Sequence, residues 1–246
     1  METPIAPERV IGAAADFARA LTELSDTGEV LYRLAEHVSE LLALDGTGVS
    51  LADDAARLHP VTGINQLTTH LEETEERLQE GPCIDAFRDG APVTVQSTAE
   101  LSAAWPQWSR AATSDGVQAA AATPLRAHDS SLGSVNLYRR AAGPWREGDL
   151  RVAGLFADMA SSYIAQRAEL ERSQQLSAQL QQALDARVII EQAKGVLATN
   201  LNCTVDHAFT VLRDHARRTS SSLRAVAHAV VHQGFQPPHP PSAPQD

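Results

Sequence analysis

The chain has 246 residues, a formal net charge of −11, 43% hydrophobic residues and two cysteines. This length predicts one large or two modest domains, and the hydrophobic content is ordinary for a soluble globular protein. No apolar run approaches the roughly 18 residues of a membrane span, and residues 1–9 lack the basic and apolar regions of a signal peptide. Cys83 and Cys203 form no disulfide framework. We therefore expect a cytoplasmic protein that does not contact a membrane.

The charge is divided unevenly along the chain. Residues 1–185 carry 14 arginines against 27 acidic residues, whereas residues 186–234 carry six basic residues against three acidic ones. Lys194, in this second stretch, is the only lysine of the whole sequence. An acidic body joined to a small basic module predicts two functions, and only the module suits a polyanion.

Helical and strand patterns alternate in the first part of the chain. Apolar residues at helical spacing predict amphipathic helices over 7–24 and after an N-cap at Asp26. The period then changes and predicts strands over 46–52 and 57–64, where Pro60 marks an edge strand or a bulge.

The next elements are shorter. The acid-rich stretch 67–80 predicts a solvated helix, and Gly81-Pro82 separates it from a short helix over 83–88. A helical segment begins at Trp105 and strands are predicted over 92–96, 117–126 and 132–140. Together these elements predict an α+β fold, with an antiparallel sheet flanked by helices.

From Glu147 a helical pattern continues to Asn202. Its middle part, residues 166–184, is predicted to be a helical connector, either a short two-stranded coiled coil or a solvated single helix. The apolar positions of this connector are Leu170, Leu176, Leu180 and Leu184. Two short helices follow, with Thr204 and the serines 220–222 as N-caps and Gly234 as the end. Residues 235–246 hold five prolines and are predicted to be a disordered tail.

The helix around Lys194 has several distinctive positions. Its predicted buried stripe consists of Ile190, Ala193, Leu197 and Leu201. Arg187 and Lys194 are two turns apart and share one flank of that stripe, where Glu191 is placed to pair with them. Gly195 destabilises a helix by about 1 kcal/mol relative to alanine, which indicates that another helix or a ligand approaches the backbone closely.

The following two helices supply further arginines. Arg213 and Arg217 are predicted to point to solvent, and Arg224 projects from the first turn of the last helix. These are groups that a phosphate backbone would use. The alternative is an ordinary solvated face whose arginines pair with neighbouring acids.

Three runs within this module, residues 183–197, 202–213 and 222–230, resemble the ANTAR domain, with Ile190-Glu-Gln-Ala-Lys-Gly195 as the most distinctive stretch. The resemblance implies a three-helix RNA-binding module that acts in transcription antitermination, works as a dimer and recognises paired short RNA hairpins. It implies that Arg187 and Lys194 contact phosphate or base, that Gln192 reads a base edge, and that Ala193 and Gly195 permit close approach. Further contacts are expected from Arg213, Arg217 and Arg224. At residues 198–200 the chain lacks a basic residue that the family often has.

The body of the chain, over about residues 10–165, resembles a GAF domain of the type fused to ANTAR modules in actinobacterial regulators. The segments that carry this resemblance are residues 80–93, 105–106, 123–125 and 132–138. It implies a sensor and dimerisation unit for an unknown small-molecule or protein signal, whose long terminal helix transmits that signal. The expected domains are therefore 1–165 for the GAF-like unit, 166–184 for the connector, 185–234 for the ANTAR module and 235–246 for the tail.

Other sites are open to two interpretations. Cys83 is either a redox sensor or ligand anchor, or a small buried residue. A second group either lines a pocket or serves packing: Trp105, Trp108, Arg126 and Asn136. Asp53-Asp54 is a β-turn, because no parallel βα pattern of a phosphorylated receiver surrounds it.

No catalytic motif is present. The sequence has no Gly-rich phosphate loop, nucleophile elbow or HExxH motif, and its histidines and cysteines lack metal-ligand spacing. We therefore expect no enzyme, no metal and no cofactor. The sequence predicts a signal-responsive RNA-binding antitermination regulator; the alternative is a protein-interaction or dimerisation regulator that does not bind RNA.

Overall fold

The computed structural model describes residues 5–24, 26–99, 103–128 and 130–238. The chain divides into two compact units, Met1–Ala168 and Glu169–Asp246. One helix, α6 (Glu147–Asn200), contributes residues to both.

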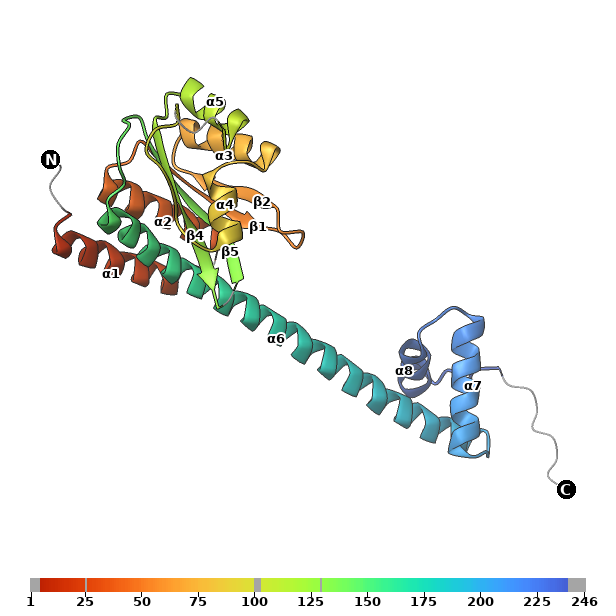
Figure 1. Cartoon of the computed structure of the whole chain (residues 1–246). Coiled ribbons are helices and arrows are strands. Elements are labelled where there is room, and N and C mark those ends of the chain that lie inside the picture. Colours follow the sequence, from red (N-terminus) through yellow and green to blue (C-terminus); the bar gives the residue numbers. More distant parts are fainter. Residues whose placement is uncertain (1–4, 25, 100–102, 129, 239–246) are drawn as a thin grey trace. The chain divides into compact units, whose positions relative to one another are not determined.

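The first unit is built around one antiparallel sheet (Figure 1). Its strands lie in the order β2-β1-β5-β4-β3. In chain order the elements before α6 are α1 (Pro7–Glu23), α2 (Thr27–Leu42), β1 (Gly46–Ala52), β2 (Leu58–Gly63), α3 (Gln66–Leu78), α4 (Pro82–Asp89), β3 (Val93–Val95), α5 (Pro106–Ser114), β4 (Ala119–Ala127) and β5 (Ser130–Arg139). This arrangement confirms the predicted α+β fold with helices flanking an antiparallel sheet.

Local chemistry sets several boundaries as predicted. The Asp26 carboxylate accepts a hydrogen bond from the Glu29 backbone N–H and begins α2. Strand β2 lies at the sheet edge, and its register with β1 shifts between Val49 and Ser50, where Ser50 pairs with Pro60. The prediction of an edge strand or bulge at Pro60 is therefore confirmed, because a bulge accommodates a residue without a backbone N–H.

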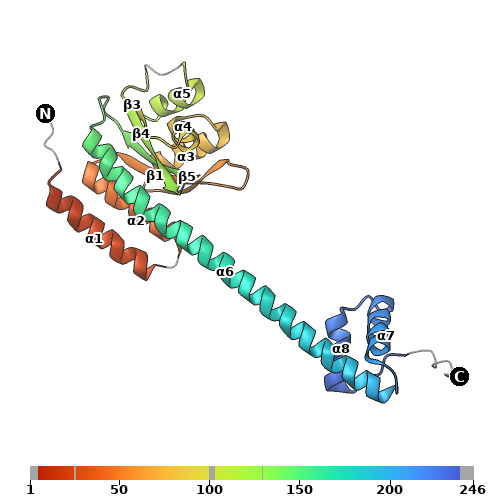
Figure 2. The same ribbon diagram turned by 60° about the horizontal axis from the view of Figure 1, so that its bottom comes forward.

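The two faces of the sheet are covered by different helices (Figures 1 and 2). One face packs against α2 and the first part of α6, and α1 packs in turn against α2. Its core includes Phe17, Leu31, Val135, Leu137 and Phe156. The opposite face packs against α3, α4 and α5. The unit thus has three layers, with the sheet in the middle.

The sheet face toward α3 carries small and polar residues. Gly48 and Ser50 of β1 and Asn136 of β5 all lie next to Glu72 of α3. A Cβ atom built on Gly48 would collide with the Glu72 side chain, so only glycine permits this close approach. The prediction that residues 67–80 form a solvated helix is therefore wrong in part: the helix is present, but Glu72 and Glu75 are buried.

The second unit contains the end of α6 with α7 (Val205–Arg218) and α8 (Leu223–Gln233). Thr204 and Ser222 accept hydrogen bonds from backbone N–H groups three residues ahead and begin α7 and α8. Gly234 ends α8 with φ of 65°. The buried core comprises Ala193, Leu197, Ala208, Leu212, Ala216, Val226, Ala227 and Val230. The predicted three-helix unit and its caps are confirmed.

Residues 235–238 continue along this unit. The Phe235 ring lies 5.1 Å from the His215 ring, centroid to centroid, and Arg218 donates a hydrogen bond of 3.2 Å to the Pro238 carbonyl. These four residues differ from the predicted disordered tail because an aromatic ring and a carbonyl find partners on α7. The rest of the predicted tail, residues 239–246, lies outside the described residues.

Candidate nucleic-acid interface

Lys194 is held in place by two neighbours. Its Nζ donates to both carboxylate oxygens of Glu191, each at 2.9 Å, as the spacing predicts. The same Nζ lies 5.5 Å from the centroid of the Phe209 ring on α7. The Lys194 side chain is only 16% exposed, against 57% for Glu191. The Lys194 ammonium group is therefore held in one position. The carboxylate of Glu191 is more exposed to solvent than the Lys194 side chain.

The two small residues beside Lys194 have opposite surroundings. Ala193 is 0% exposed and belongs to the core, so the prediction that it permits close approach to RNA is wrong. It lies within the apolar stripe, and its methyl group packs against the other helices. Gly195 is exposed, and a Cβ built there meets nothing within 4 Å. No described part of this chain therefore approaches Gly195 closely.

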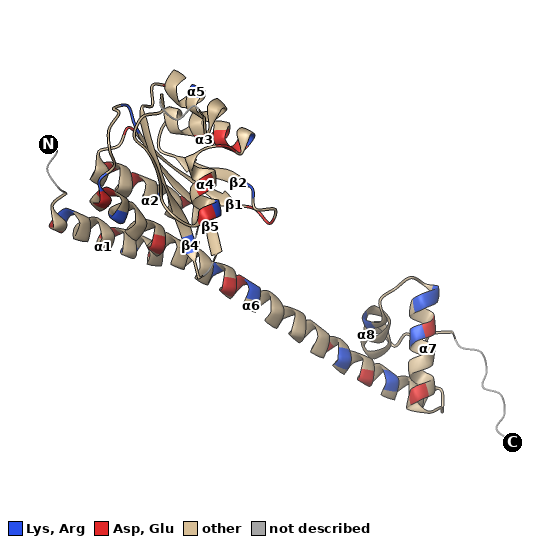
Figure 3. Ribbon diagram, viewed as in Figure 1, with Lys and Arg blue, Asp and Glu red and all other residues tan. Residues whose placement is uncertain are grey.

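The basic residues of α7 extend from the same neighbourhood. Arg213 lies one helical turn beyond Phe209, and Arg217 lies one turn beyond Arg213. Both are exposed, and Arg213 Nε is 3.7 Å from Asp214 Oδ1, a loose pair. Figure 3 shows the basic positions on α7 and on the end of α6. We call Lys194, Arg213 and Arg217 the basic track.

A second set of predicted residues gathers on the α8 side of α6. A groove of about 280 Å³ is lined by Asp185, Val188, Ile189, Gln192, Arg224 and His228. It brings Gln192 together with Arg224, two predicted contact residues that lie 32 positions apart in the sequence. Sequence reasoning missed Asp185 and His228, although His228 follows Arg224 by one helical turn and so shares its face. Arg187 is exposed but does not line this groove.

Cys83 lies in the first turn of α4, in the first unit. It is 1% exposed, and burial, with further contributions from Glu75 and Glu72, raises the pKa of its thiol well above the ordinary value. A reactive cysteine needs a thiolate in electropositive surroundings. The burial of Cys83 and the raised pKa of its thiol therefore favour the interpretation as a small buried residue over that of a redox sensor.

Of the other pocket candidates, Trp105 and Trp108 pack edge to face, with their ring centroids 6.0 Å apart. Trp108 and Asn136 are buried, at 0% and 1% exposure, so they serve packing. Arg126 is exposed and donates a hydrogen bond of 3.3 Å to the Gly90 carbonyl. Asp53 accepts from the backbone N–H groups of Ala55 and Arg57, each at 2.9 Å, which fits the predicted turn.

The architecture defines a helix-covered α+β unit followed by a small three-helix unit with an exposed basic surface. The family model of the GAF domain matches residues 26–164, more than half of the chain, and that of the ANTAR domain matches residues 178–231. The chain belongs to the GAF family and carries an ANTAR domain. GAF domains are sensor domains and ANTAR domains are RNA-binding antitermination domains, so the chain is a regulator of this kind.

Solved structures share the fold of the first unit. The GAF domain of a phosphoenolpyruvate-protein phosphotransferase from Coxiella burnetii has a TM-score of 0.54 at 12% identity, over 67% of this chain and 98% of that chain. The free methionine-R-sulfoxide reductase from Neisseria meningitidis has a TM-score of 0.52 at 14% identity, over 69% of this chain and 98% of that one. At such identities the likeness concerns the fold alone.

The search of curated proteins gave no match to this chain. Among the residues that the structure describes, no helix is both long and apolar enough to cross a membrane. Within those same ranges, no group of three or more His, Cys, Asp or Glu side chains is arranged to hold a metal ion.

Proposed function

We propose that this protein is a dimeric, cytoplasmic, non-catalytic antitermination regulator, which binds paired RNA hairpins through its ANTAR domain in response to a signal at its GAF domain. The observation that carries the proposal is the basic track beside the open backbone at Gly195. Fixed and exposed cations on adjoining helices suit a phosphate backbone. The exposed glycine lets a partner come close without a side chain in between.

Dimerisation is supported by the connector part of α6. Four leucines there are 50–58% exposed: Leu170, Leu176, Leu180 and Leu184. A second copy of the helix would cover them, since apolar seams of this kind drive two-stranded pairing. Two joined ANTAR domains would bind two linked hairpins with greater avidity than either domain alone.

The proposal is tested with an RNA of two short hairpins and with Lys194→Ala. We expect the variant to bind more weakly and its salt dependence to fall by about one unit of log–log slope, because one phosphate contact is lost. Arg151→Ala is the matched control. It removes an exposed cation of α6 that pairs with Glu147 in the first unit, and we expect it to bind like the wild type. RNA binding that changes neither with salt nor with Lys194→Ala would contradict the assignment of Lys194 as an RNA contact.

A second candidate is a protein-interaction regulator that does not bind RNA. The Lys194–Glu191 pair favours it, because Glu191 offsets the charge that an RNA phosphate would need. Pull-down before and after RNase separates the two candidates. Partners that survive RNase, with no RNA recovered, would support the second candidate and exclude the first.

A further inference from the structure

A group of polar side chains is sealed between α3 and the sheet. Glu72 accepts hydrogen bonds from the Ser50 hydroxyl at 2.7 Å and from the Asn136 amide at 2.8 and 2.9 Å. The Tyr138 hydroxyl lies 2.9 Å from Glu72 Oε1 and 3.2 Å from Glu75 Oε2. Glu72 and Glu75 are 1% and 2% exposed. Helix α3 therefore presents two carboxyl groups to the buried interior of the unit.

The hydrogen bonds around the Tyr138 hydroxyl require one more proton than the tyrosine itself supplies. A phenol carries one hydrogen, so Tyr138 can fully satisfy only one of the two carboxyl oxygens beside it. Glu72 already receives hydrogen bonds from Ser50 and Asn136, which marks it as the ionised acceptor. The arrangement is complete when Glu75 is protonated and donates to Tyr138 Oη, while Tyr138 donates to Glu72. If both glutamates were ionised, the two carboxylates would have to share the single hydrogen of the Tyr138 hydroxyl, and their charges would repel each other.

No cation relieves this pair within the described part of the chain. The groups that face the two carboxyl groups are Ser50, Asn136, Tyr138, Cys83 and Trp108. Of these, only Cys83 and Tyr138 titrate, and burial holds the pKa of each well above its ordinary value, so both stay neutral. Among the described residues, no well-formed hydrogen bond reaches Glu75 Oε1 or Trp108 Nε1, although the Trp108 and Cys83 side chains face the Glu75 carboxyl group.

Burial raises the pKa of Glu72 and Glu75, and the charge of Glu72 raises the pKa of Glu75 further. Two adjacent buried carboxyl groups cannot both ionise without a large free-energy cost. If Glu75 loses its proton to solvent, the repulsion is relieved when α3 moves its inner face toward water.

We propose that a proton held between Glu75, Tyr138 and Glu72 locks α3 onto the sheet, and that the GAF domain senses proton activity through this site. In this proposal the proton is the signal that the sensor domain receives. Its regulatory role rests on the proposed function. The proton site itself is tested without RNA.

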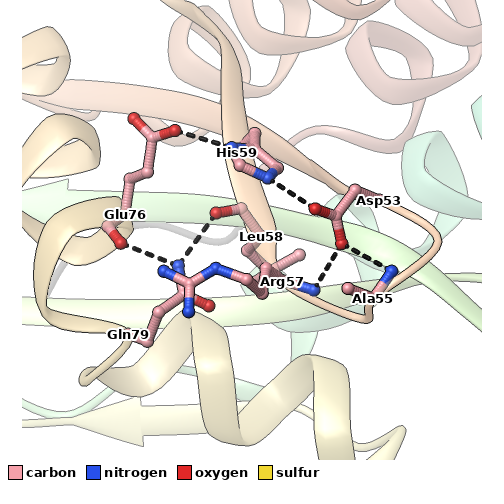
Figure 4. Close-up of polar contacts among 7 residues, drawn as sticks. All are labelled: Asp53, Ala55, Arg57, Leu58, His59, Glu76 and Gln79. Atoms are coloured by element: carbon pink, nitrogen blue, oxygen red, sulfur yellow. Dashed lines mark hydrogen bonds and ion pairs between the residues drawn. The ribbon is translucent and has the colours of Figure 1, made fainter.

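A second titratable contact on the outer side of α3 acts in the same direction (Figure 4). The His59 ring lies between two carboxylates, with Nδ1 at 2.6 Å from Glu76 Oε1 and Nε2 at 3.0 Å from Asp53 Oδ2. Both ring nitrogens donate only in the protonated imidazolium. Hydrogen bonds to Glu76 and then Asp53 raise the pKa of His59. This contact ties the β1–β2 hairpin to α3 and is weakened when His59 loses its proton.

Both contacts therefore favour docked α3 at low pH. Each group has a folded-state pKa above its unfolded value, so its stabilisation is fully present below the unfolded value and is lost as pH rises through the folded value. Unfolded values are about 4.3 for Glu and 6.5 for His. Alkalinisation releases α3 and acidification holds it.

The test is chemical unfolding of the full chain across pH, compared between wild type, Glu75→Gln and Glu73→Gln. Glutamine at 75 keeps a donor toward Tyr138 and cannot ionise. In the wild type, Glu75 should change the folding equilibrium constant by about tenfold per pH unit between its unfolded and folded pKa values. We expect this pH dependence to be absent in Glu75→Gln. Glu73 is exposed on the same helix, and Glu73→Gln should retain the wild-type pH dependence.

Infrared difference spectroscopy of the wild type gives a second measurement that does not depend on how the variants fold. We expect the C=O band of a buried protonated carboxylic acid at neutral pH, and its loss on alkalinisation together with a change in Trp108 emission. Absence of that band, or a Glu75→Gln protein with unchanged pH dependence, would overturn the proposal. Neither result would bear on RNA binding, so failure here is distinct from failure of the proposed function.

Discussion

Lys194 and Glu191 form a bidentate pair in which the ammonium nitrogen lies 2.9 Å from both carboxylate oxygens. An ion pair at this helical spacing stabilises a helix by only about 0.2–0.5 kcal/mol. Its main effect is on what Lys194 can bind, because any phosphate that meets the ammonium group also meets Glu191.

We expect Glu191→Gln to tighten RNA binding. Removing one repelled charge at contact distance in water is worth about 1 kcal/mol, or roughly fivefold in affinity. The measurement is a titration of the two-hairpin RNA at low salt, and the difference should shrink as salt is added. Glu169→Gln, on the connector, should leave affinity unchanged. Weaker binding by Glu191→Gln would mean that this carboxylate itself accepts a hydrogen bond from RNA.

Gln192 and Arg224 line one groove, but they should respond differently to substitution. If Gln192 reads a base edge, Gln192→Ala should lower affinity by about 1–3 kcal/mol without changing the salt slope, because no charge is removed. Arg224→Ala should reduce that slope by about one if it contacts phosphate. Binding isotherms at several salt concentrations check both. Identical salt behaviour of the two variants would rule out this division of roles.

The close approach of α3 to the sheet predicts a sharp effect at Gly48. A methyl group there collides with the Glu72 side chain, so Gly48→Ala should lower the free energy of unfolding by about 1–3 kcal/mol through overpacking. Gly154 is the matched control in α6, where an added Cβ meets nothing within 4 Å. Gly154→Ala should stabilise the protein by about 0.5–1 kcal/mol. Denaturant unfolding measures both, and a neutral Gly48→Ala would show that α3 sits more loosely.

His59 should contribute stability at low pH. Its pKa is raised, so His59→Gln should destabilise the first unit below about pH 6.5 and approach the wild type as pH rises beyond the folded value. At the acid end Asp53, whose pKa is lowered mainly by the Arg57 backbone N–H and then by His59, loses its own contribution as pH falls. The pH series of unfolding midpoints checks this, and a constant difference between His59→Gln and wild type at every pH would contradict it.

A substitution in the connector should change the oligomeric state of the protein. Leu180 is 57% exposed, and Leu180→Arg should prevent two helices from pairing, because a charge replaces an apolar side chain in the seam. Sedimentation equilibrium should then report a monomer and weaker binding to a two-hairpin RNA, with single-hairpin binding retained. Gln182→Arg, an exposed position nearby, should leave the assembly unchanged. A wild-type protein that is already monomeric would exclude the dimer.

Patterns of apolar spacing and capping residues predict most of the fold, because they act locally. Asp26, Thr204 and Gly234 each occupy the cap position that their side chain or missing side chain favours. The inner face of α3 could not be predicted in this way. An acid-rich stretch ordinarily faces water, and only the small residues of β1 and β5, distant in sequence, create a place for Glu72.

At the candidate nucleic-acid interface, too, local sequence patterns predict only the contacts that lie within one helix. The spacing of Glu191 and Lys194 predicts their pair, since one helix fixes it. The helical stripe also places Ala193 inside, yet the family resemblance suggested an RNA contact there, and packing decides for the core. The groove joins Gln192 to His228 only because α8 folds back onto α6, which no local pattern contains.

The core of the ANTAR domain has one further consequence. Four of its eight buried members are alanines: Ala193, Ala208, Ala216 and Ala227. Such a core removes little apolar area from water, so the domain draws little stability from it. Bound RNA adds its own free energy to the folded state. We therefore expect unoccupied ANTAR domains to be the first segment that a protease cleaves, so that target abundance sets how long each regulator molecule survives.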